Sequence, residues 1–132
     1  MASRADDWFR QAERDLGHAR TSAEAGDHEW AAFAAQQTAE KALKAVLQAQ
    51  GVEARGHAAH ALLRTLPTPL LDGADVEALR AAARELDRHY IPSRYPNSIP
   101  EGAPFEVYDE EQSKRAIAAA ERILGFCQRH LA

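Results

Sequence analysis

Arg94 lies in a proline-rich segment, YIPSRYPNSIPEGAP, which spans residues 90–104 and is called the strap below. Prolines recur in it at every fourth position, at Pro92, Pro96, Pro100 and Pro104. Because proline restricts the backbone, we expect the guanidinium of Arg94 to be held ready for a bidentate contact, either with a phosphate or with a carboxylate of a partner subunit. Tyr95 either stacks on a base or plugs the helical core, and we favour core packing.

Lys41 and Lys44 are further candidate ligands for an anion. They are two of the three lysines and share a predicted helical face with Gln37, so their ammonium groups suit a phosphate, although each one taken singly is more simply a surface charge. Glu40 precedes Lys44 by four residues, which is the favourable order for a helical ion pair. For that pair alone we favour a solvated helix face, stabilised by roughly a few tenths of a kcal/mol.

Metal and thiol chemistry have little support in the sequence. His57 and His60 have a spacing that can share a metal on a helix, but no carboxylate or thiol stands nearby to complete the site. Cys127 falls on an apolar helical stripe, which is typical of a buried small side chain and not of a nucleophile. We find no glycine-rich phosphate loop and no serine elbow. The sequence therefore predicts neither a metal site nor a cofactor.

The composition limits the possible classes of protein. The chain has 132 residues, which predicts one domain over residues 1–132, and its 20 acidic and 16 basic residues give a net charge of -4. This charge argues against a protein that coats nucleic acid through its overall charge. One cysteine cannot form an internal disulfide, no apolar run suits a membrane span, and MASRADDW lacks an apolar signal region. We expect a cytoplasmic location.

The elements that must position these residues are predicted to be helices. Apolar residues at helical spacing predict long helices from the N-cap Ser3 to Gly26, from Asp27 to Gly51, from Asp75 to Tyr90 and from Asp109 to the end, with a short connector helix in HAAHALLRTLP. The predicted fold class is therefore all-α: an up-and-down antiparallel bundle of four main helices plus the connector. We expect aromatic side chains to hold the strap against this bundle, namely Tyr90, Tyr95, Phe105 and Tyr108.

Four segments occur in a recognisable order and spacing: WFRQAERDLGHA, EWAAFAAQQTAEKALKAVL, GHAAHALLRTL and LDRHYIPSRYPN. Together they resemble the HEPN domain (higher eukaryotes and prokaryotes nucleotide-binding), specifically its small stand-alone prokaryotic members with an Arg-Tyr-Pro signature. The resemblance covers nearly the whole chain. It implies an antiparallel helical bundle that commonly forms a homodimer, a link to nucleotides or RNA, and frequent partnership with a small nucleotidyltransferase-fold protein in a pair similar to toxin and antitoxin.

The resemblance also indicates a set of binding or interface residues. The family pattern falls on Gln37, Glu40, Lys41, Lys44, His57, Arg94, Tyr95 and Pro96. Asn97 stands where many relatives use aspartate, which puts in doubt any role there that needs a carboxylate.

Arg84 and His89 have the Arg-x4-His spacing of ribonucleases in the same superfamily, which cleave RNA without metal across a dimer. Histidine can move protons near neutral pH, and arginine can stabilise the charge on a phosphorane. However, Arg84 lies among other regularly spaced arginines, and Ile91 stands where some ribonuclease members carry tyrosine.

The sequence thus predicts a dimeric HEPN-type module that binds nucleotide, nucleic acid or a nucleotidyltransferase-fold partner, with catalysis not assumed. Two alternatives stay open. One is a metal-independent endoribonuclease toxin that uses Arg84 and His89. The other is a non-catalytic scaffolding subunit whose strap only builds an interface.

Overall fold

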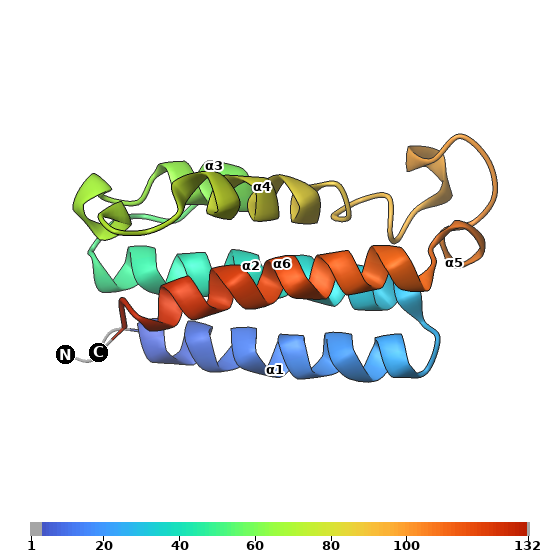
Figure 1. The fold of residues 1–132 in the computed structure, drawn as a ribbon, viewed down its shortest axis with the longest axis horizontal. Helices are drawn as coiled ribbons and strands as arrows, with labels where there is room; N and C mark the ends of the chain where they lie inside the picture. The colour runs from blue at the N-terminus through green and yellow to red at the C-terminus, as the bar shows by residue number, and fades with distance from the viewer. Residues whose placement is uncertain (1–3, 132) are drawn as a thin grey trace.

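The computed structural model describes residues 4–131, and helices dominate this part of the chain. The four long helices are α1 (Ala5–Glu24), α2 (His28–Ala49), α4 (Val76–Asp87) and α6 (Glu110–Gln128). The short elements are α3 (Ala59–Arg64), α5 (Pro104–Val107) and the 3-10 helices η1 (Thr68–Leu71) and η2 (Pro96–Ser98). Successive long helices run in opposite directions (Figure 1), so the predicted all-α antiparallel bundle is confirmed.

Short-range hydrogen bonds explain where the helices begin and end. At the start of α6 the side chains and backbone amides of Asp109 and Gln112 bond reciprocally, both at 2.9 Å, in a capping box, so the predicted start at Asp109 is confirmed. The predicted N-cap Ser3 lies outside the described residues. Helix α4 ends at Asp87, earlier than the predicted end at Tyr90. Pro92 lacks a backbone N–H and disfavours helical geometry in the residue before it, so the chain turns before the proline.

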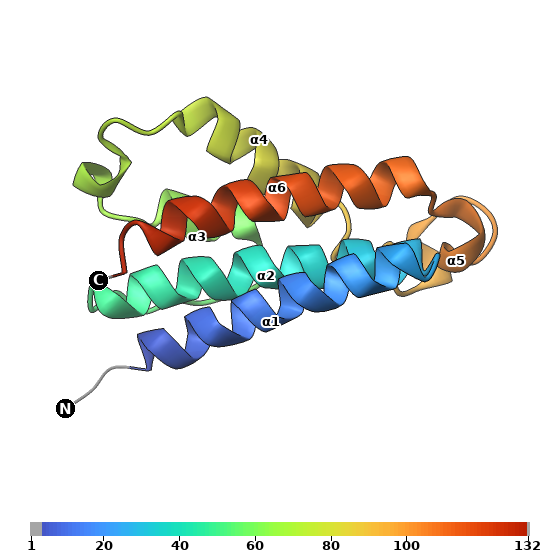
Figure 2. The same ribbon diagram turned by 60° about the horizontal axis from the view of Figure 1, so that its bottom comes forward.

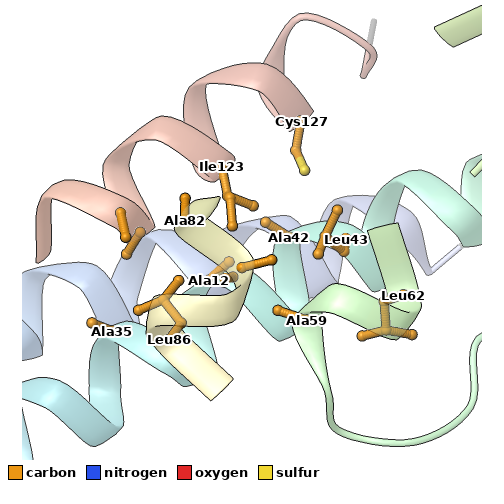
Figure 3. Packing of buried hydrophobic residues seen from close by; sticks show 14 of the residues in the cluster. Ala12, Ala35, Ala42, Leu43, Ala59, Leu62, Ala82, Leu86, Ile123 and Cys127 are labelled. Carbon is orange, nitrogen blue, oxygen red and sulfur yellow. The ribbon is translucent and has the colours of Figure 1, made fainter. Parts of the chain in front are cut away.

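Helix α2 lies at the centre of the core and contacts α1, α3, α4 and α6. Figure 3 shows Ala12 of α1, Leu86 of α4 and Ile123 of α6 gathered beside Ala35 and Ala42 of α2. Small side chains on α2 let the neighbouring helices approach closely. None of the helices in residues 4–131 is long and apolar enough to cross a membrane.

Cys127 of α6 belongs to this core and is fully buried. Burial raises the pKa of its thiol far above the usual value, so the sulfur stays protonated. The prediction of a buried small side chain is confirmed.

The strap lies at the end of the bundle where α1 turns into α2, together with α5 (Figures 1 and 2). The prediction that four aromatic side chains anchor it is only half right. Tyr108 is buried and Tyr90 is partly buried, but Tyr95 is 49% exposed and Phe105 is 69% exposed. Two of the four rings therefore remain at the surface.

Candidate anion-binding site

The guanidinium of Arg94 is held among three aromatic rings. Its central carbon lies 4.5 Å from the ring centre of Phe33, 4.9 Å from that of Tyr90 and 5.0 Å from that of Tyr95. Its Nε donates a hydrogen bond to the backbone carbonyl of Tyr90 at 2.9 Å. Within residues 4–131 no carboxylate pairs with Arg94, so the terminal amino groups keep their N–H donors for another molecule.

The backbone before Arg94 forms a tight turn that fixes this geometry. The amides of Arg94 and Tyr95 both donate to the carbonyl of Ile91, at 3.0 and 3.2 Å. The hydroxyl of Ser93, which is buried, donates to the carbonyl of His89. Hydrogen bonds within the turn, together with the surrounding rings, thus add to the restraint expected from the prolines.

The carboxylate of Glu40 contacts two of the other candidate binding residues of α2, Gln37 and Lys44. One carboxylate oxygen, Oε2, lies 3.0 Å from Nζ of Lys44 and 3.1 Å from Nδ1 of His57, and Oε1 accepts a longer bond from Gln37 at 3.5 Å. The Glu40–Lys44 pair is therefore confirmed, but the prediction of a solvated face is wrong because Glu40 is buried. The loop that carries His57 covers this part of α2, and the ion pair lies beneath it.

Tyr90 links this cluster to Arg94. The imidazole ring of His57 stacks on the Tyr90 ring with centroids 5.2 Å apart and an interplanar angle of 15°. The same tyrosine ring faces Arg94 and lies 6.3 Å from Phe33. The contacts therefore run without interruption from Glu40 through His57 and Tyr90 to Arg94.

Both lysines already have carboxylate partners. Lys41 pairs with Asp15 of α1 at 2.6 Å, and Lys44, besides its contact with Glu40, lies 5.6 Å from the ring centre of Trp8. The charge of each ammonium is therefore locally balanced. Arg94 is the stronger candidate for an anion ligand, and the lysines offer only the N–H groups that their carboxylates leave free.

Tyr95, Pro96 and Asn97 form the outer edge of the site. The preferred assignment of Tyr95 to packing is wrong: half of the residue is exposed, and its ring lies against Arg94. Pro96 and Asn97 open η2 and are both exposed, and the side chain of Asn97 makes no hydrogen bond with the described residues. All three are therefore accessible to a ligand beside Arg94.

The candidate ribonuclease pair is arranged differently. Arg84 is exposed on α4, whereas His89 is buried, with Nε2 2.8 Å from a Glu85 oxygen and Nδ1 2.8 Å from the Tyr108 hydroxyl. Burial lowers the pKa of His89 against the opposing effect of Glu85, and burial raises the pKa of Tyr108 to about 12. A neutral imidazole satisfies both contacts, since Nε2–H donates to the carboxylate and Nδ1 accepts from the hydroxyl. His89 therefore connects Glu85 of α4 to Tyr108, which lies just before α6.

The sequence analysis missed Phe33 and Trp30, and it assigned Tyr90 only to the end of a helix and to anchoring the strap. A signal was present, because Trp30, Phe33, Gln37 and Lys41 follow one another at steps of three or four residues, which places them on one face of α2. This face carries the exposed Trp30 and the half-buried Phe33, Gln37 and Lys41, so it differs from the alanine-rich buried faces of the same helix.

Comparisons with known proteins identify relatives along almost the entire chain. The family model described as "HEPN domain" matches residues 5–130. A search of curated proteins gave no match.

Three crystal structures are similar to this chain. The first is TT1696 from Thermus thermophilus, with 42% identity, a TM-score of 0.92, and coverage of 98% of this chain and 100% of the other. The second is ST0689, described as an archaeal HEPN homologue, with 41% identity, a TM-score of 0.81, and coverage of 99% and 100%. The third is a HEPN domain protein from Thermotoga maritima, with 33% identity, a TM-score of 0.70, and coverage of 93% and 95%.

Proposed function

The chain belongs to the HEPN domain family, and from this premise we propose that it is a binding module whose Arg94 holds the phosphate of a nucleotide or nucleic acid. The observation that carries the proposal is the guanidinium fixed among the rings of Phe33, Tyr90 and Tyr95 without a carboxylate partner in residues 4–131. A fixed arginine of this kind can make two parallel N–H···O bonds to one phosphate, and it loses little conformational entropy on binding.

The neighbouring residues support this role by holding Arg94 in place. Glu40 fixes His57, and His57 supports the Tyr90 ring, whose backbone carbonyl accepts from Arg94. Lys44 stays paired with Glu40. With a net charge of -4, the chain suits a ligand with few phosphates better than a long duplex.

In this proposal the chain acts without catalysis and with partners. It forms a homodimer and works beside a small nucleotidyltransferase-fold protein, as the family membership suggests. His89 is buried, and each of its ring nitrogens is already hydrogen-bonded, so it gives no support to an RNA-cleaving role within one chain. The scaffolding alternative places a partner's carboxylate, instead of a phosphate, against Arg94.

The test is the substitution Arg94→Lys, with ATP and a short RNA as probes. Lysine keeps the charge but loses the bidentate geometry, so binding should weaken by about 1 to 3 kcal/mol while the melting temperature and sedimentation remain nearly unchanged. Arg80→Lys is the matched control, because Arg80 is an exposed arginine on α4 that pairs with Glu77. It should bind both probes as the wild type does.

The opposite pattern identifies an interface. If Arg94→Lys binds ATP and RNA normally but dissociates or melts early, Arg94 holds a partner's carboxylate and the phosphate-site proposal is wrong. The two sets of measurements must be made on the same samples, because a loss of binding in a partly unfolded variant would mimic a loss of the site.

A further inference from the structure

A shallow hollow of about 200 Å³ lies between α1 and α2, beside the ring of Phe33. Trp30 and Phe33 of α2 line it, together with Ala34, Gln37 and Lys41 of the same helix and Asp15 and His18 of α1. The Phe33 ring is common to the hollow and to the Arg94 site. The hollow is smaller than the roughly 300–1,000 Å³ of sites that enclose a whole drug-sized ligand, so it suits one ring system and not a complete nucleotide.

The aromatic wall of the hollow is exposed. Trp30 is 51% exposed, and its ring meets Phe33 edge-to-face, with centroids 6.1 Å apart and an interplanar angle of 76°. An indole in this position presents a flat apolar surface to solvent, on which a planar ring can stack.

The α2 side of the polar wall offers an acceptor and a donor, and on the α1 side the imidazole of His18 lines the hollow without a hydrogen bond to residues 4–131. The amide nitrogen of Gln37 donates to Gln36 at 2.8 Å, which leaves the Gln37 carbonyl oxygen without a partner among residues 4–131. Lys41 is bonded to Asp15 and has three N–H groups, so donors remain for another molecule. Because Gln37 and Lys41 are four residues apart on α2, the acceptor and the donor lie side by side on one helix face.

From this arrangement we infer that the hollow binds the base of the nucleotide whose phosphate Arg94 holds, and that it selects a base whose Watson–Crick edge carries an exocyclic amine beside an unprotonated ring nitrogen, as in adenine and cytosine. The amine donates to the Gln37 carbonyl, the neighbouring ring nitrogen accepts from Lys41, and the ring stacks on Trp30. Uracil carries its O4 acceptor beside the N3–H donor at the corresponding edge. In the same pose its O4 therefore faces the Gln37 oxygen and its N3–H faces Lys41, so neither hydrogen bond forms. The inference rests on the proposed phosphate site at Arg94.

Calorimetric titrations with ATP, UTP and inorganic tripolyphosphate, in buffer without divalent metal, test the base site separately from the phosphate site. In Trp30→Ala, ATP should bind about 10-fold or more weakly, because the stacking surface is lost, while tripolyphosphate affinity should change by less than about 2-fold. Phe105→Ala is the matched control, since Phe105 is also an exposed ring but lies in α5, outside the hollow. It should leave all three affinities unchanged.

A second variant tests the selection of the base. Wild type should bind ATP more tightly than UTP, and Gln37→Met, which keeps the length of the side chain but removes the carbonyl, should bring the two affinities to within about 2-fold of each other. The melting temperature of this variant shows whether the helix is intact.

The outcomes separate the two ideas. If ATP and tripolyphosphate bind equally well and Trp30→Ala changes neither, the base site is refuted while the phosphate site stands. If Trp30→Ala weakens tripolyphosphate as much as ATP, the base site is also refuted, because Trp30 then acts on the phosphate. If wild type binds neither compound, the proposed function and the base site both fail.

Discussion

Replacing Glu40 by glutamine should destabilise the protein far more than an exposed substitution of the same kind. The Glu40 side chain is 6% exposed, and its partner Lys44 is 13% exposed, with Oε2 and Nζ 3.0 Å apart. Glutamine has nearly the same shape, so the substitution removes the negative charge without leaving a cavity. The ammonium of Lys44 then remains largely buried without an opposite charge, and His57 loses the carboxylate beside Nδ1.

The size of the effect follows from this burial. Removing one partner of a fully buried ion pair costs about 3–5 kcal/mol, mainly because the remaining charge is left desolvated. Lys44 keeps some contact with water and has a flexible stem, so part of this cost is relieved when the ammonium moves outward. We therefore expect Glu40→Gln to lower the free energy of unfolding by about 2–3 kcal/mol.

The chain contains its own control. Glu110 and Lys114 have the same four-residue spacing, at 3.6 Å, but their side chains are 72% and 71% exposed. Glu110→Gln should cost less than about 1 kcal/mol, including its interaction with the N-terminal end of α6. Urea denaturation of both variants measures the difference. Equal costs for Glu40→Gln and Glu110→Gln would refute the reasoning, since burial would then make no difference.

Two other expectations concern acid sensitivity and assembly. Burial lowers the pKa of His89 in the folded chain below its usual value, so the unfolded chain binds the proton more readily. The contribution of neutral His89 to the free energy of unfolding is therefore complete above about pH 6.5 and declines as the pH falls below that value. Urea denaturation should therefore show that His89→Gln loses less stability than wild type between about pH 7.5 and pH 5.5, and equal losses would contradict this. Light scattering at micromolar concentration should give about twice the chain mass of 14.5 kDa, and a monomeric mass would remove the predicted dimer.

Local patterns were sufficient to predict the helices, because helix formation depends on residues close in sequence. The capping box of Asp109 and Gln112 marks the start of α6 in the sequence and in the structure. Alanines at helical spacing in α2 are typical of close helix packing, and they lie in the core. The end of α4 was misplaced beyond Asp87, since Tyr90 continues the apolar spacing although the backbone has already turned.

The site was harder to predict because its contacts join residues that are distant in the chain. The spacing of Glu40 and Lys44 correctly predicted their pairing, but it could not show that a loop 17 residues further along would cover them and contribute His57. Likewise, the sequence around Arg94 gives no sign of Phe33, which reaches the guanidinium only when the strap folds back onto α2. Tertiary contacts of this kind are not encoded in local periodicity.

The buried charges around Glu40 are better explained by the geometry they impose than by stability. A buried ion pair contributes little net stability compared with apolar residues of similar volume, because desolvation offsets the attraction between the charges. Unlike an apolar contact, however, the Glu40 carboxylate fixes a direction: it holds Nδ1 of His57 at 3.1 Å, and this orients the imidazole ring that stacks on Tyr90. Tyr90 in turn holds Arg94 through its ring and its carbonyl. Apolar replacements of both Glu40 and Lys44 would preserve the bundle while leaving His57, and through it Arg94, without a defined position. The cost of burying the charges is therefore consistent with a role in placing the arginine.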